Sequence, residues 1–259
     1  ILSGNCFEPR GLDELYPGWR NMTENKPPID TKVTSDEFFV LLGQTNSIQI
    51  PHIFHPKTID NHQNYLISLG KLCGWLAERA TELGVDIFTG TPGSQVLYNE
   101  KGAVKGVITG DFGIGKNGKK KDNYQGGIEI EARQTVFAEG CRGSLSEKVI
   151  EKFKLRRDSD PQIYGIGLKE VWEVDGNPNF KPGRVQHTVG WPLSTDVYGG
   201  SFLYHILPNQ IHLGMVVGLD YKNPYLNPYE EFQRLKNHPR IRDQIEGGKC
   251  ISYGARALN

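Results

Sequence analysis

The sequence predicts an α/β chain of the α+β type, and three observations carry that prediction. A long segment with helical apolar spacing lies in the first half, and a strand followed by a glycine-rich turn and a helix comes after it. The remainder, from residue 162 to 253, is dominated by short alternating runs that are typical of strands. An α/β half is therefore followed by a predominantly β half.

The first sixty residues predict little regular structure apart from a helical turn and two strands. Residues 1–30 are irregular and rich in Pro and Gly, with a short helical stretch from Leu12 to Tyr16. Its bulky apolar neighbours, among them Trp19, form either a core-facing turn or a segment that dips into a membrane interface. Residues 32–42 and 47–51 place β-branched and aromatic residues between turn signals, which predicts strands.

The clearest predicted helix covers residues 64–83. Its apolar residues recur at steps of three and four, which makes one apolar face. Asn61 or Asn64 is a suitable N-cap, and Gly84 is suited to the left-handed position after the helix. A short strand over residues 85–88 is expected to follow.

A β-hairpin and a polar loop are predicted next. Residues 95–98 and 104–109 alternate around the turn at residues 99–102. Residues 111–125 are rich in Gly and Lys and predict a polar surface loop, with the run Lys119 to Lys121 at a solvated tip.

The most informative local pattern is a strand, a glycine turn and a helix around residue 140. Strands are predicted at residues 128–132 and 134–138, and a helix from Ser144 to about Lys154. A helix that starts after such a turn suits a phosphate or another anion, but an ordinary strand-to-helix turn has the same pattern. The spacing is neither GxGxxG nor a Walker loop, so it does not by itself indicate nucleotide binding.

The β-rich half contains four predicted strands and one helix. The strands are expected at residues 164–174, 183–191, 200–207 and 212–220, and the helix near residues 228–236.

Composition excludes several classes of protein. Thirty Lys and Arg balance thirty Asp and Glu, which argues against nucleic acid as a partner. Four widely spaced cysteines form no disulfide framework, and no apolar run approaches the roughly 20 residues of a transmembrane helix. The chain starts at Ile1 without a methionine, and we expect it to be an internal piece of a longer protein.

Several sequence strings resemble one family of flavoproteins. The string Ala-Glu-Gly-Cys-Arg-Gly-Ser at residues 138–144 resembles the second FAD fingerprint of the p-hydroxybenzoate-hydroxylase-like flavoproteins, with Glu139 in place of the usual Asp. The glutamate, together with one extra residue before the serine, makes this string resemble the corresponding string of the electron-transfer-flavoprotein:ubiquinone oxidoreductases. Longer matching strings begin at Leu2, Tyr164, His187, Tyr198, Val216, Glu230, Glu246 and Tyr253.

The resemblance implies a fold and a set of domains. The expected fold is an FAD-binding domain of the p-hydroxybenzoate-hydroxylase-like type, intertwined with a β-rich quinone-binding domain. The expected division is a membrane-dipping, flavin-proximal segment (1–30), a part of the quinone domain (31–60), a part of the FAD domain (61–155), the ubiquinone-binding domain (156–253) and a return to the FAD domain (254–259).

The resemblance also implies a function. Such an enzyme passes electrons from reduced electron-transfer flavoprotein, through FAD and a 4Fe-4S cluster, to ubiquinone. It is held on one membrane leaflet as a monotopic protein, on the matrix face of the mitochondrial inner membrane or on a bacterial cytoplasmic membrane. The alternatives are a related reductase, of the FixC type or similar to geranylgeranyl reductase, and a non-catalytic β-rich ligand-binding module.

The resemblance carries over a few site residues. Tyr198, Gly199 and Gly200 correspond to the quinone pocket, where side-chain-free glycines let a flat ring approach a peptide N–H. The residues implied to contact FAD are Ser3, Gly4, Val96, Glu139, Gly140 and Asn259.

No protein side chain is expected to act as a catalytic base or nucleophile, because the cofactors carry the chemistry. His187 and His205 flank the quinone segment, and we expect both to be structural. The ligands of the 4Fe-4S cluster are expected outside this chain, because Cys6, Cys73, Cys141 and Cys250 lack the clustered spacing of such ligands, and no other metal site is predicted.

Overall fold

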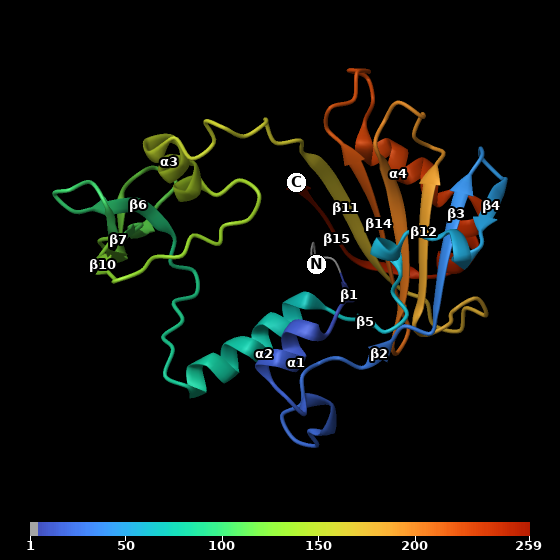
Figure 1. Cartoon of the computed structure of the whole chain (residues 1–259), viewed down its shortest axis with the longest axis horizontal. Coiled ribbons are helices and arrows are strands. Elements are labelled where there is room, and N and C mark those ends of the chain that lie inside the picture. Colours follow the sequence, from blue (N-terminus) through green and yellow to red (C-terminus); the bar gives the residue numbers. More distant parts are fainter. Residues whose placement is uncertain (1–4) are drawn as a thin grey trace. The chain divides into compact units, whose positions relative to one another are not determined.

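The computed structural model describes residues 5–259, which form two compact units (Figure 1). One unit is built from the residues up to Gly84 together with those from Ile163 onward, and the other from residues 85–162. The Ser3 and Gly4 predicted to lie near a flavin are outside the described residues.

A seven-stranded sheet is the centre of the first unit, in the order β15-β11-β14-β13-β12-β3-β4 (Figure 1). All neighbours are antiparallel except β12 and β3, which run parallel. The strands span β3 (Ser35–Leu41), β4 (Ser47–Ile50), β11 (Gly165–Glu173), β12 (Arg184–Gly190), β13 (Gly199–Ile206), β14 (Gln210–Gly218) and β15 (Lys249–Leu258). The predicted strands of the β-rich half are confirmed.

Two helices supply the core on one face of this sheet. Alternate residues of β14, such as Leu213 and Met215, are buried in one cluster with Phe232 of α4 (Pro228–Lys236) and Ile241 of α5 (Pro239–Ile245). The Asn227 side chain caps α4, accepting the backbone N–H of residue 229 at 3.0 Å. The bounds of α4 match the prediction, whereas α5 was not predicted.

A small sheet and a helical layer complete the unit. The sheet has the order β1-β5-β2. The helical segments beside it pack together through a cluster of buried side chains around Leu12, Trp19, Leu72 and Trp75. The elements are β1 (Cys6–Phe7), α1 (Arg10–Leu15), η1 (Trp19–Asn21), β2 (Thr31–Lys32), η2 (His52–Phe54), η3 (Lys57–Ile59), β5 (Tyr65–Leu66) and α2 (Leu69–Glu82).

The helix α2 starts five residues later than predicted. Tyr65 and Leu66 are strand residues that pair with both β1 and β2, so the helix cannot include them. Ser68, rather than an asparagine, is the N-cap, and its hydroxyl accepts the Lys71 N–H at 3.5 Å. Gly84 has a φ of +87° after the helix, as the sequence predicts.

The second unit consists of two small sheets and one helix. The predicted hairpin forms β6 and β7, and α3 packs on it through the buried Leu145, which faces Gly93. The elements are β6 (Gly93–Tyr98), β7 (Val104–Thr109), β8 (Phe112–Ile114), β9 (Lys120–Gln125), β10 (Glu129–Glu131) and α3 (Ser144–Phe153). Residues 111–125 are therefore a hairpin, not a loop, although the lysine run is exposed as predicted.

Two predicted strands do not form in the described chain. Residues 85–88 and 134–138 lie outside any sheet, and their apolar side chains are exposed, 67% for Phe88 and 87% for Val136. A strand is defined by hydrogen bonds to a neighbour, which local sequence preference cannot supply.

Candidate functional site

The segment Tyr198-Gly199-Gly200 forms the start of β13. Gly199 and Gly200 lie opposite Val217 and Val216 of β14, and the Gly218 N–H donates to the Tyr198 carbonyl at 2.7 Å. Tyr198 itself is 82% exposed. The backbone of this segment is thus held by β14, while its aromatic ring is free to meet a ligand.

Both glycines are needed because neighbouring strands come close. A Cβ on Gly199 would lie 2.4 Å from the Val216 carbonyl oxygen, and a Cβ on Gly200 would lie 2.6 Å from that of Thr188. Real Cβ atoms do not approach other atoms this closely. The glycines therefore meet a packing requirement of the sheet, whatever they contact besides it.

Hydrogen-bond alternation decides where the Gly199 peptide groups point. Tyr198 and Gly200 bond toward β14, so the N–H and C=O of Gly199 point to the other side, toward β12. The residue pairs between β12 and β13 end at Thr188 and Ser201, two residues before the level of Gly199. The Gly199 N–H is therefore directed to the end of the sheet, beyond the last pair that β12 and β13 form.

Little space lies between the strands at this point. The cavity lined by Gly200, Ser201, Trp191 and Leu235 has a volume of about 10 Å³, too small for a ring. A planar ligand would have to approach from the exposed side that Tyr198 occupies.

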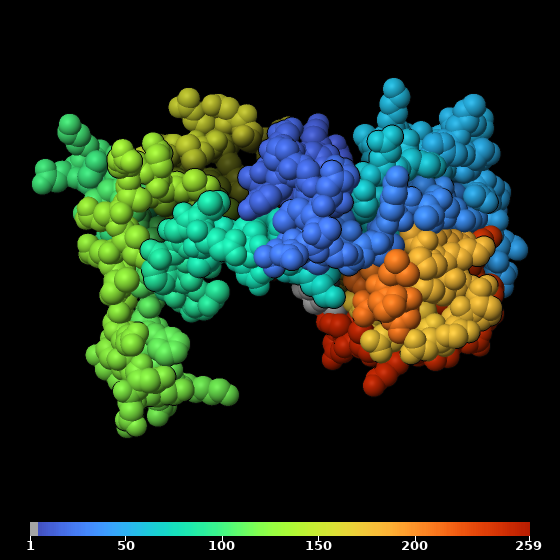
Figure 2. Space-filling model, turned by 90° about the horizontal axis from the view of Figure 1, so that it is seen from below, coloured from blue at the N-terminus to red at the C-terminus, as the bar shows by residue number. Residues whose placement is uncertain are grey.

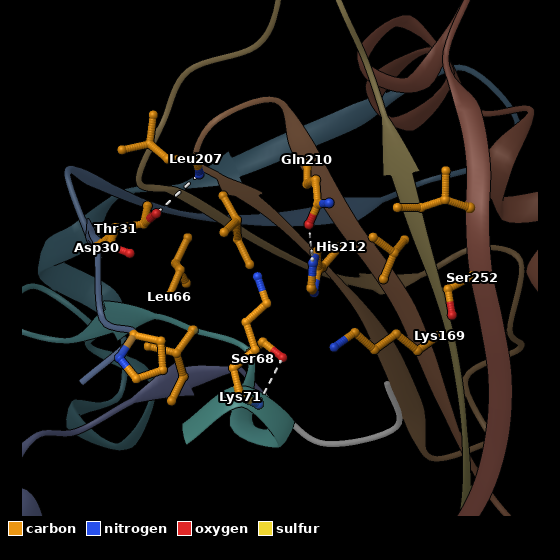
Figure 3. Close-up of a pocket in the computed structure, with 15 residues that line it drawn as sticks. Asp30, Thr31, Leu66, Ser68, Lys71, Lys169, Leu207, Gln210, His212 and Ser252 are labelled. Carbon is orange, nitrogen blue, oxygen red and sulfur yellow. Dashed lines mark hydrogen bonds between the residues drawn. The ribbon is translucent and has the colours of Figure 1, made fainter. Parts of the chain in front are cut away.

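A second, larger and more polar cavity lies at the other end of β13. It has a volume of about 300 Å³ and is lined by residues of β2, β5, β11, β14, β15 and α2, together with Ile206 at the end of β13 and Leu207 after it. Figure 3 shows the amines of Lys71 and Lys169 pointing into this cavity beside His212.

Burial sets the protonation of the groups in this second cavity. The Lys169 amine donates to the Asn5 side chain at 3.3 Å, and Asn5 also contacts His212 Nδ1 at 3.0 Å. Burial lowers the pKa of Lys169 to about 8 and that of His212 to about 3, because the charged forms lose hydration. The imidazole of His212 is neutral at pH 7, whereas the Lys169 amine is still mostly protonated there and loses its proton at a lower pH than an ordinary lysine.

Sequence reasoning did not single out this cavity. Its basic residues are far apart in the chain and have no motif spacing, since they meet only through the packing of α2 on the sheet. The one signal was Lys169 itself, a lysine in the middle of a strand, between Leu168 and Glu170.

The residues predicted to contact a flavin are distributed over both units. Val96 lies in the middle of β6, half-buried, and Gly140 has a φ of +82°, in the left-handed region that favours glycine. Asn259 is exposed, directly after β15.

Glu139 has a defined structural role. Its carboxylate accepts the backbone N–H of Ser146 at 2.6 Å and the Ser146 hydroxyl at 2.7 Å, and the Leu145 N–H also donates to it at 3.3 Å. Burial opposes the charged form, but these hydrogen bonds outweigh it and hold the pKa of Glu139 below 4.5. The anion at the start of α3 is therefore the protein's own carboxylate.

The histidines that flank the quinone-like segment are bonded within the sheet. His187 Nε2 contacts the Tyr204 hydroxyl at 2.8 Å, and His205 Nε2 contacts Gln244 Oε1 at 2.8 Å. Burial lowers the pKa of both imidazoles. The expectation that both are structural is consistent with these contacts.

The described part of the proposed membrane segment, residues 5–30, is only partly exposed. Leu12 and Trp19 are 4% and 5% exposed and pack in the core, so the core-facing alternative is correct for them. Leu15, at 62%, is exposed. No helix in the described part of the chain is long and apolar enough to cross a membrane.

Comparison with solved structures defines the class of fold. A flavoprotein/dehydrogenase from Cytophaga hutchinsonii aligns with 99% of this chain and 57% of its own, at a TM-score of 0.61 and 16% identity. Aklavinone-11 hydroxylase, solved with FAD and aklavinone, aligns with 99% of this chain and 46% of its own, at 0.53 and 14%. The fold is that of the p-hydroxybenzoate-hydroxylase-like flavoproteins.

Sequence comparison then gives the relatives of this chain. Residues 164–258 match the family model described as ETF-QO, ubiquinone-binding. The whole chain aligns with the electron transfer flavoprotein-ubiquinone oxidoreductase of Pseudomonas aeruginosa (47% identity) and with the mitochondrial one of Bos taurus (50%). It spans 46% and 41% of their lengths. The whole chain is therefore similar to slightly less than half of an electron transfer flavoprotein-ubiquinone oxidoreductase.

Proposed function

We propose that the protein to which this chain belongs passes electrons from reduced electron-transfer flavoprotein, through FAD and a 4Fe-4S cluster, to ubiquinone. The observation that carries this proposal is the match of residues 164–258 to a ubiquinone-binding family model, within a chain that aligns end to end with the named oxidoreductases. The cofactors carry out the redox chemistry, and this chain positions the molecules that exchange electrons with them.

The ubiquinone headgroup is proposed to bind at the open start of β13. The Gly199 N–H, which points toward the end of the sheet, would donate to a headgroup carbonyl. The exposed Tyr198 ring would cover one face of the quinone, at a site that no side chain at residues 199 and 200 obstructs. The sheet supports both contacts because β14 fixes the backbone.

FAD is proposed to contact Ser3, Gly4, Val96, Glu139, Gly140 and Asn259. The turn at Gly140 fits such a group, since its left-handed backbone carries no side chain that would block a close approach. The Glu139 carboxylate already accepts hydrogen bonds from Ser146 at the start of α3, so its role is to stabilise the backbone of this turn. The 4Fe-4S ligands are proposed to lie outside this chain.

Membrane contact is proposed through a different segment from residues 1–30. Leu42, Ile48, Ile53 and Phe54 are 60%, 53%, 84% and 73% exposed, and we name this group the apolar edge. It lies on the β3–β4 hairpin and on η2, in the light blue segment at the surface in Figure 2. Large exposed apolar side chains on one short stretch of the chain suit one leaflet of a bilayer, in mitochondria the matrix side of the inner membrane or in bacteria the cytoplasmic membrane.

The experiment that tests the quinone site uses the full-length enzyme. Tyr198→Ala should raise the KM for a short-chain ubiquinone about tenfold, since one aromatic contact contributes roughly 1–1.5 kcal/mol. FAD content should not change. The matched control is Tyr253→Ala, because Tyr253 is 80% exposed and lies three strands away on β15.

One result would contradict the site, and another would contradict the function. Equal KM values for the two variants would place the headgroup elsewhere, and the polar cavity beside Lys169 would then be the next position to examine. A full-length protein that lacks flavin would contradict the proposed function itself.

A further inference from the structure

A group of metal-ligating side chains lies in the segment between β4 and β5. His52, Asp60 and His62 each offer one ligand atom, and these atoms lie within 4.8 Å of one another. His62 Nδ1 is 2.7 Å and His52 Nε2 is 3.7 Å from the same carboxylate oxygen, Asp60 Oδ1. This is the only group of three or more such residues in the part of the chain that the structure describes.

The geometry brings the donors together without a metal ion. The two imidazoles of His52 and His62 lie edge to face, with ring centroids 4.4 Å apart. The Asp60 carboxylate also accepts the backbone N–H of His62 at 3.1 Å, which fixes its position relative to that ring. Three donors from two short stretches of chain therefore converge on one point.

A third histidine lies beside the group. The ring of His55 is 4.9 Å from that of His52. Its Nε2 contacts the Ile50 carbonyl at 2.9 Å, while its Nδ1 is buried and has no hydrogen-bond partner among the described residues. A buried nitrogen without a partner is unfavourable, and it is an independent sign that the local polar network is incomplete.

The chemistry of the donors selects the class of ion. Two imidazoles and one carboxylate suit Zn²⁺, Ni²⁺ or Cu²⁺, whereas Mg²⁺ and Ca²⁺ prefer oxygen ligands. Bonds of about 2.0–2.1 Å to one ion allow its ligand atoms to be up to roughly 4 Å apart. The separations of 2.7 and 3.7 Å from Asp60 Oδ1 are compatible with one shared ion. The two histidine nitrogens lie within 4.8 Å of each other, so a small rotation of these exposed rings is enough for both to reach the ion.

We propose that His52, Asp60 and His62 bind one divalent transition-metal ion of the zinc class. The ion takes the place of the direct contact between His62 Nδ1 and the Asp60 carboxylate. With three protein ligands, a further position stays open to water.

Binding would stabilise the segment that carries part of the apolar edge. His52 begins η2, which holds Ile53 and Phe54, while Asp60 and His62 follow η3. An ion between them would join the start of η2 to the chain after η3. The metal site does not depend on the proposed electron transfer, because its residues and its measurement are separate from it.

The test measures zinc binding by the full-length protein after treatment with a chelator. Titration with ZnCl₂ in a calorimeter should show one site that His52→Ala and His62→Ala each weaken at least about tenfold. The control is Asp243→Asn, an exposed carboxylate paired with Arg242, which should bind zinc as the wild type does. All three variants change exposed side chains, and circular dichroism verifies that each is folded.

Either of two outcomes would overturn the proposal. One is the absence of saturable zinc binding in the wild type. The other is binding that neither histidine variant weakens relative to the Asp243 control. Zinc K-edge absorption of the loaded wild type should show nitrogen and oxygen ligands near 2.0–2.1 Å, and a sulfur-dominated spectrum would assign the ion to cysteines instead.

Discussion

Replacement of Gly200 by alanine is a direct test of the close strand packing at the start of β13. The new Cβ would lie 2.6 Å from the Thr188 carbonyl oxygen and 3.3 Å from Val189 Cγ1. An ordinary contact begins near 3.4 Å, so the oxygen or the new methyl must move by about 0.8 Å (3.4 − 2.6). Because Thr188 pairs with Ser201, this shift disturbs the last rung between β12 and β13.

The expected cost is that of overpacking, about 1–3 kcal/mol of unfolding free energy. In the full-length protein, the thermal transition that includes this sheet should fall by roughly 2–12 °C, at about 2–4 °C per kcal/mol. The measurement is differential scanning calorimetry, with flavin fluorescence recorded in parallel.

The matched control is Gly218→Ala in the adjacent strand. There the atoms nearest to a new Cβ are Asp220 Oδ1 at 3.0 Å, the end of a side chain that can move, and the Tyr198 carbonyl oxygen at 3.2 Å, which needs to shift by only about 0.2 Å. This variant should unfold close to the wild type. If Gly200→Ala unfolds no earlier than Gly218→Ala, the strand spacing described above is wrong.

This result also bears on how the quinone site is tested. A bulky residue at Gly199 or Gly200 damages the sheet, so lost quinone reduction in such a variant would not demonstrate contact with the headgroup. The exposed Tyr198 is the better probe because its removal leaves the strands in place.

Two further predictions concern the apolar edge and the polar cavity. Phe54→Glu should reduce flotation of the full-length protein with liposomes. The control is Tyr225→Glu, which should not reduce it, because Tyr225 is 92% exposed but lies outside the apolar edge. Equal flotation of the two variants would exclude the apolar edge as the membrane contact. Lys169→Met should remove a rise in stability with pH, measured by urea unfolding from pH 7 to 10.5. The folded-state pKa of Lys169, about 8, lies below its ordinary value of 10.5, so the unfolded chain binds more protons between these values and stability increases with pH there. An unchanged pH slope in the variant would refute the burial of this amine.

Local signals were sufficient for several elements. The bounds of α4 follow from an Asn227 cap, a proline at the first position and regular apolar spacing. The hairpin of β6 and β7 follows from alternation around a turn with Gly102 at a φ of +78°. These features depend on residues that are neighbours in the sequence, and the sequence shows them directly.

Other features depend on partners that are distant in the chain. Residues 134–138 have the composition of a strand but no neighbour to pair with in the described chain. Trp19 is of a residue type that is common at membrane surfaces, but it is buried in a cluster that includes Trp75. In both cases local composition permits two environments, and only the surrounding structure selects one.

The family resemblance and the β-rich second half were determined by the sequence alone, because matching strings and period-two alternation are properties of the chain itself. The domain boundaries and the quinone and flavin residues stay predictions. Only the tertiary structure decided that Gly199 and Gly200 lie between crowded strands and that Lys169 is buried. It also decided that His52, Asp60 and His62 meet. The physical reason is that burial and close approach are set by which surfaces pack together, and packing joins residues that the sequence keeps apart.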